Sequence, residues 1–147
     1  MLILQKLRTH YRYSPFLIEA FIWLGMARLA MLTLPFRRIE PYLGTRMAES
    51  PFDEFPEDCR QLQQVAWAVN KMSNYTLWQS KCLVQAMAAK RMLQSRQIAS
   101  TLYLGVTKSN SQALKAHAWL RSGSIYLTGG QGQKQFTVVA TFAEESW

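Results

Sequence analysis

The sequence predicts an α+β fold in which helices come first and an antiparallel sheet follows. Before residue 97, apolar residues recur at three- and four-residue steps, whereas after it they alternate with polar residues. The first period is typical of helices and the second of half-buried strands. With 147 residues and 49% hydrophobic content, the chain is long and apolar enough for one domain with a single core.

The first predicted helix covers residues 16–34, an almost wholly apolar segment that Pro35 closes. It has the length of a membrane span, but Arg28 near its centre would cost about 2.5–3.5 kcal/mol on insertion, and Glu19 adds to that cost. Three interpretations stay open here: a membrane span, contact with a membrane surface, and a helix that is buried or faces a partner. Apolar residues surround nearly the whole helix, so packing on one side leaves a second apolar surface uncovered.

Residues 35–57 contain four of the five prolines, at positions 35, 41, 51 and 56, and this density predicts a connector with few regular elements. The next helix is predicted over 58–72, where Leu62, Val65 and Val69 recur at helical spacing. We therefore divide the chain into an N-terminal helical and proline-rich segment, 1–57, as a candidate partner-binding part, and a core, 58–147.

A third predicted helix covers 81–93 and begins beside Cys82. Two starts compete for it: Thr76 with Gln79 forms a capping-box pattern, whereas Ser80 as N-cap places Cys82 at the second helical position. Only the second start gives a Cys82 thiolate the full helix dipole.

Four period-two segments follow, at 101–106, 114–120, 124–128 and 136–142, and their short polar connections predict an antiparallel meander. A tight two-residue turn at Gly123 joins the second and third segments. Pairing across that turn predicts Trp119 opposite Tyr126, and His117 opposite Thr128.

Cys82 at a helix start and His117 on a strand form a candidate nucleophile and base. Thiol chemistry requires the thiolate, which a helix N-terminus and a nearby imidazole both favour, and a strand is a rigid mount for the imidazole. Taken alone, each residue is more often simple packing, and we interpret the other cysteine, Cys59, as a helix-packing residue.

The cysteine count and the charge limit the setting. Two cysteines without a Cys-x-x-Cys spacing predict neither a disulfide framework nor a zinc site, and the charged start of the chain does not resemble a secretory signal. We therefore expect a cytoplasmic protein, with peripheral membrane contact left open. The net charge of +8 suits an acidic partner, but the basic residues are scattered and match no nucleic-acid module, so we expect no nucleic-acid binding.

Four segments together resemble one family. They are Trp78-x-x-x-Cys82-Leu83, residues 102–106, Ala116-His117-Ala118-Trp119, and residues 136–142. From about Trp67 to Phe142, the chain resembles the transglutaminase-like leader peptidases of lasso-peptide biosynthesis. The resemblance implies a nucleophile-bearing helix packed on an antiparallel sheet, as in transglutaminase-like and papain-like cores. It also implies that the substrate is a ribosomal precursor peptide, and that a small leader-binding protein and an ATP-dependent lasso cyclase are the partners.

The resemblance further implies roles for individual residues. Cys82 would be the nucleophile and His117 the base, while backbone amides near Cys82 with Gln79 or Trp78 would hold the oxyanion. Trp78 and Trp119 would also line the substrate site, with no cofactor and no metal. Such families usually complete a Cys-His-Asp triad, and the expected aspartate position here holds Thr128.

A threonine hydroxyl can accept a hydrogen bond from the imidazole, but it cannot stabilise an imidazolium as a carboxylate does. Residues 59–143 contain no carboxylate side chain, so an acid from the first half, Asp53, Glu57 or Asp58, would have to fold back to replace it. Two other function classes stay open: a noncatalytic module that binds the leader or precursor, and an acyl-transferring enzyme of transglutaminase type.

Overall fold

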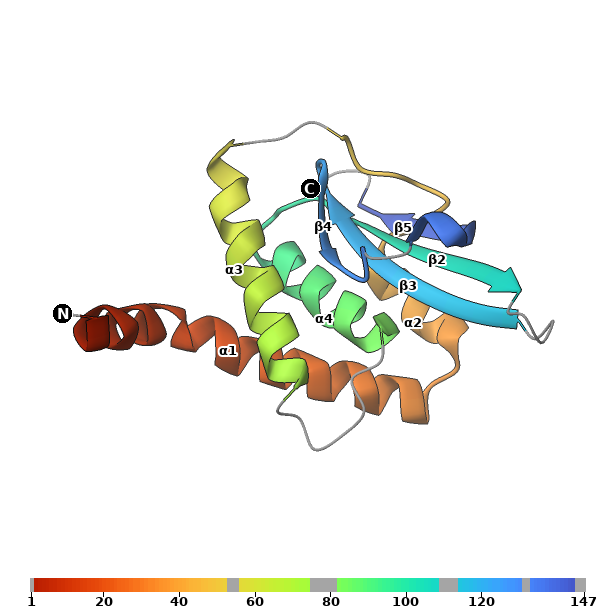
Figure 1. The fold of residues 1–147 in the computed structure, drawn as a ribbon. Coiled ribbons are helices and arrows are strands. Elements are labelled where there is room, and N and C mark those ends of the chain that lie inside the picture. The colour runs from red at the N-terminus through yellow and green to blue at the C-terminus, as the bar shows by residue number, and fades with distance from the viewer. Residues whose placement is uncertain (1, 53–55, 75–81, 109–113, 131–132, 145–147) are drawn as a thin grey trace.

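The computed structural model describes residues 2–52, 56–74, 82–108, 114–130 and 133–144. Within these ranges the chain forms four α-helices and a five-stranded antiparallel sheet, which confirms the α+β prediction. Helix α4 (Cys82–Ser95) packs against the sheet, and α1 (Leu2–Thr33) and α3 (Pro56–Ser73) pack on α4 and on each other. Figure 1 shows α4 lying between the sheet and these two helices. The predicted packing of the Cys82 helix on an antiparallel sheet is therefore confirmed.

The N-terminal half differs from the prediction in two places. Helix α1 begins at Leu2 and continues through Pro15, so it is longer than the predicted 16–34 segment. The predicted connector over 35–57 is wrong in part, because it contains α2 (Phe36–Leu43) and the short strand β1 (Thr45–Arg46). Ile39 and Leu43 stand four residues apart and are both buried, so packing supports a helix that Pro41 by itself disfavours.

The sheet has the strand order β1-β5-β2-β3-β4, with all pairs antiparallel. Strands β2 (Thr101–Lys108), β3 (Leu114–Ser122) and β4 (Ile125–Thr128) form the predicted meander. The prediction is wrong for β5 (Thr137–Ala143), which pairs with β2 and β1 and not with β4. After β4 the chain returns across the sheet and forms β5 between β2 and β1, where Ala140 and Phe142 join the buried core.

The register across the Gly123 turn also differs from the prediction. Arg121 pairs with Tyr126 and Leu120 with Thr128, so neither predicted pair, Trp119 with Tyr126 or His117 with Thr128, is formed. The turn has the predicted length of two residues but is displaced by one, with Ser122 directly opposite Ile125, and the register shifts between Leu120 and Arg121. Such a bulge inserts one extra residue into a strand and redirects the side chains beyond it.

A buried ion pair ties α4 to the end of β5. Lys90, 1% exposed, donates from Nζ to Glu144 Oε1 at 2.9 Å, to Ser100 O at 2.8 Å and to Ser100 Oγ at 3.1 Å. Glu144 also accepts hydrogen bonds from Gln94 Nε2 and from the backbone N–H of Ser100. Burial lowers the pKa of Lys90 from 10.5, and the Glu144 carboxylate partly opposes that shift.

Candidate active site

Cys82 is the first residue of α4 and is half-buried. The first turn of α4 carries no acidic side chain. The free backbone N–H groups and the dipole at a helix N-terminus attract negative charge, and no carboxylate in this turn competes for them. The start of α4 can therefore stabilise an oxyanion that forms beside Cys82.

His117 lies in β3, three residues beyond the last pair that β3 forms with β4. Side chains alternate along a strand, so His117 and Trp119 share one face while Leu120, which belongs to the helix-packed core, lies on the other. The imidazole stacks with the Trp119 ring at a centroid distance of 5.7 Å and packs against Phe136 at 4.9 Å. The base candidate thus lies in an aromatic layer on the sheet face opposite the helices.

This aromatic layer is closely packed. The Trp119 and Tyr103 rings are nearly parallel, with centroids 5.4 Å apart. A Cβ atom on Gly105 would lie 2.8 Å from the Trp119 ring and 2.9 Å from Phe136 Cβ, so only glycine leaves room for the indole there. The Trp119 ring therefore supports the imidazole by packing against it. Its predicted substrate-binding role stays a prediction.

The imidazole makes a hydrogen bond with a backbone carbonyl. His117 Nε2 lies 2.8 Å from Gly129 O. A carbonyl oxygen can only accept, so Nε2 carries the proton, and in the neutral ring Nδ1 is then the nitrogen with a free lone pair. This tautomer presents Nδ1 as the basic atom.

Gly129 can hold this position because it has no side chain. Its φ is +64°, and a Cβ atom there would lie 2.4 Å from Ala118 O and 3.2 Å from His117 Nε2. Sequence reasoning missed this residue. The Gly129-Gly130 pair was the available signal, but it indicated only a loop.

Thr128, at the expected aspartate position, makes no hydrogen bond with the imidazole. It is 7% exposed, and its Oγ1 has no hydrogen-bond partner among the described residues. Thr128 lines a cavity of about 550 Å³ together with Asn70 from α3, Gln85 from α4, and residues 126–130. Gln85 lies one turn after Cys82, so this cavity adjoins the start of α4.

The structure does not join Cys82 to His117 by a hydrogen bond, and it does not describe the remaining predicted site residues. Among the described residues, no hydrogen bond joins Cys82 Sγ to the imidazole. Trp78, Gln79 and Asp53 lie outside the described residues, and so do the side chains of the other two candidate acids, at positions 57 and 58.

Sequence reasoning also missed a buried arginine behind the aromatic layer. Arg121 donates to Tyr103 Oη at 2.9 Å, to Ser50 O at 2.9 Å and to Gly123 O at 2.7 Å, and its guanidinium lies 3.7 Å from the centre of the Phe52 ring. Burial raises the pKa of Tyr103, although its hydrogen bond with Arg121 acts in the other direction. The arginine fastens the segment around Ser50 to the face that carries His117.

Within the part of the chain that the structure describes, no group of three or more His, Cys, Asp or Glu side chains could hold a metal ion.

Comparison with protein-family models matches residues 27–141 to the family described as the transglutaminase-like superfamily. The matched range includes Cys82, His117, Thr128 and Gly129. Comparisons with curated proteins and with solved structures returned no match.

Proposed function

Because the chain belongs to the transglutaminase-like superfamily, whose activity is of the cysteine-protease or transglutaminase type, we propose that it is a cysteine peptidase. Its proposed substrate is the ribosomal precursor of a lasso peptide, from which it removes the leader. One observation carries the mechanistic part of the proposal: Gly129 O holds Nε2–H of His117, which leaves Nδ1 free to act as the base.

In the proposed reaction, His117 Nδ1 accepts the proton of the Cys82 thiol, and the thiolate attacks the scissile carbonyl carbon. Backbone N–H groups at the start of α4 stabilise the oxyanion. The imidazolium then gives its Nδ1 proton to the leaving amine as the C–N bond breaks, and a thioester remains on Cys82. A water molecule, deprotonated by Nδ1, hydrolyses that thioester and regenerates the thiol.

Gly129 O supports both protonation states of the ring, because Nε2 carries a hydrogen in each of them. The carbonyl dipole stabilises the imidazolium less than a full carboxylate charge does. In this structure His117 lies on the sheet face opposite α4, so catalysis requires a rearrangement that brings Cys82 Sγ and Nδ1 within hydrogen-bond distance. We therefore propose that the precursor, together with the small leader-binding protein, completes the site, and that the isolated chain turns over slowly.

The cleavage test uses mass spectrometry of a lasso precursor incubated with this chain and the leader-binding partner. The variants are Cys82→Ala and His117→Ala, and Cys59→Ala is the matched control because Cys59 is also half-buried and lies on α3. The proposal predicts cleavage at one bond by the wild-type and Cys59→Ala proteins and none by the other two. Equal cleavage by Cys82→Ala would overturn it.

A noncatalytic precursor-binding module is the second candidate. It is favoured by the packing of the His117 ring between Trp119 and Phe136, and by the lack of a hydrogen bond from the imidazole to Cys82 Sγ. Such a module would bind the precursor equally well after Cys82→Ala, and iodoacetamide would modify Cys82 no faster than Cys59. An acyl-transferring enzyme would instead incorporate an added primary amine into the product.

The proposed setting is the cytoplasm, where precursor peptides are made. The product of leader removal has a new free amino terminus, which suits an ATP-dependent lasso cyclase that forms a macrolactam from that amine. We propose that this cyclase acts on the product, and that it and the leader-binding protein are the two protein partners.

A further inference from the structure

Helix α1 has two apolar faces, of which the fold covers only one. Ala20, Leu24 and Ala27 are buried, and α1 packs on α3 and α4. On the opposite side of the helix, five large apolar side chains are each 52–65% exposed. We call them the outer stripe: Ile18, Ile22, Met26, Leu29 and Leu32.

The outer stripe is continuous and uncharged. Its residues stand three or four positions apart, so they form one row along the helix, about 20 Å long. The nearest acidic group, Glu19, lies at the border of the row and is paired with Arg96 at 2.6 Å. An exposed apolar row of this length normally indicates a docking surface.

The charges around the stripe indicate the occupant. Residues 1–38 contain six basic residues and one acidic residue, and that acidic residue, Glu19, is the one neutralised by Arg96. Arg37 and Arg38 are exposed just beyond the end of α1. An apolar row with a surplus of positive charge is complementary to an anionic lipid surface, into which the apolar side chains insert while the arginines meet the headgroups.

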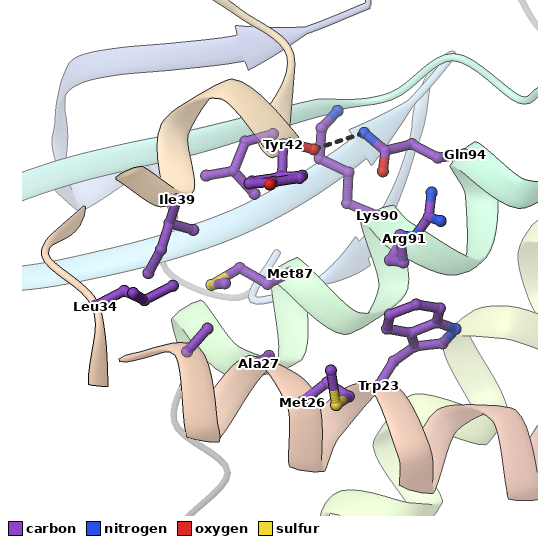
Figure 2. Close-up of a pocket in the computed structure, with 12 residues that line it drawn as sticks. Trp23, Met26, Ala27, Leu34, Ile39, Tyr42, Met87, Lys90, Arg91 and Gln94 are labelled. Carbon is purple, nitrogen blue, oxygen red and sulfur yellow. Dashed lines mark hydrogen bonds between the residues drawn. The ribbon is translucent and has the colours of Figure 1, made fainter. Parts of the chain in front are cut away.

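A cavity beside the stripe has the same character. It measures about 460 Å³, lies between α1, α2 and α4, and is lined mainly by apolar side chains (Figure 2). Arg91 lies over the Trp23 ring at 5.0 Å, and Tyr42 is 77% exposed. Tryptophan and tyrosine are the residues that concentrate at membrane interfaces.

The covered face of α1 decides how the helix would meet lipid. Residues Pro15–Thr33 are long and apolar enough to cross a membrane by length and composition. A crossing helix would have to leave α3 and α4 and expose the residues that bury Leu24. Contact through the outer stripe requires no such separation.

We propose that the outer stripe is a membrane-docking surface, on which α1 lies in the plane of an anionic lipid bilayer with Arg37 and Arg38 at the headgroups. This proposal does not depend on the peptidase activity. It places the protein at the membrane surface through a part of the fold remote from β3, so the sheet face that carries His117 stays available.

The test is co-sedimentation of the full chain with phosphatidylcholine vesicles, with and without phosphatidylglycerol. Binding is expected only to the anionic vesicles and is expected to weaken as salt is raised. Replacing both Arg37 and Arg38 by Gln should lower partitioning on the order of 30-fold, since each basic residue contributes about a factor of five.

The apolar part is tested by Ile22→Glu, with Leu114→Glu as the matched control. Both replace an exposed aliphatic residue by the same acid, but Leu114 begins β3 and lies outside the stripe. Ile22→Glu should reduce vesicle binding roughly tenfold or more, whereas Leu114→Glu should leave it unchanged. Circular dichroism of each variant establishes that it is folded.

Three results would overturn the proposal. The first is a folded wild-type chain that does not sediment with anionic vesicles, and the second is an equal loss of binding in both glutamate variants. The third is that the wild-type chain binds the leader-binding protein in solution and does not bind vesicles, and that Ile22→Glu abolishes this protein binding. The outer stripe would then be a protein-binding surface.

Discussion

Removing the Glu144 carboxylate is expected to unfold this protein at much lower denaturant concentration. The carboxylate accepts three hydrogen bonds, from Lys90 Nζ at 2.9 Å, Gln94 Nε2 at 2.9 Å and the Ser100 backbone N–H at 3.1 Å. Glu144→Ala leaves the Lys90 ammonium buried without a counter-charge. Breaking a buried pair in this way costs about 3–5 kcal/mol of unfolding free energy. For a chain of this size that corresponds to a fall in Tm of roughly 6–20 °C.

The measurement is guanidinium unfolding followed by circular dichroism, with Glu40→Ala as the control. Glu40 is also paired with an arginine, Arg46, but at 3.8 Å and on the surface, where loss of a pair costs less than about 1 kcal/mol. The double variant Lys90→Met with Glu144→Gln removes both charges and should recover part of the stability lost in Glu144→Ala. If Glu144→Ala and Glu40→Ala destabilise equally, the reasoning from burial is wrong.

Three further predictions concern the core and the site. Gly129→Ala should cost about 1–2 kcal/mol for the positive φ alone, and long-range 1H–15N spectra should show that His117 no longer holds its proton predominantly on Nε2; an unchanged tautomer would contradict the role of the Gly129 carbonyl. Because the folded pKa of Lys90 is lowered, the unfolded chain keeps that proton to higher pH, so the unfolding free energy should rise with pH between the folded pKa and about 10.5. Lys90→Met should lack that rise in the same denaturation series. Arg121→Met should release the segment around Ser50, seen as faster amide hydrogen exchange there, while exchange in α4 stays slow.

Local periodicity predicted most of the elements. The run of residues after Cys82 and the alternation after residue 100 are short-range patterns, and α4 and β2 follow them. Helix α2 was missed because its evidence is tertiary: only burial of Ile39 and Leu43 in the folded core outweighs Pro41.

Pairing and register were less accessible. Nothing local in residues 137–143 distinguishes a strand next to β4 from one next to β2, because both would bury the same alternate side chains. Thr128 lies opposite Leu120 and not His117, because the turn is displaced by one residue and a bulge follows between Leu120 and Arg121. The hydrogen-bond partner of the imidazole could not be predicted either. It is a backbone carbonyl, which every residue has, so the residue type does not reveal it.

The position of β5 has a consequence for folding. It is the last strand in chain order, yet it lies inside the sheet, with β1 on one side and β2 on the other. The segment that leads to it contributes both Gly129 O and Phe136, the two groups that hold the imidazole from outside β3. During synthesis the helices and the β2–β3–β4 meander can form first. The β2–β5 and β1–β5 pairs join segments that are far apart in sequence, so they form slowly. In a nascent chain the His117 imidazole therefore lacks these two contacts until β5 has paired with β2.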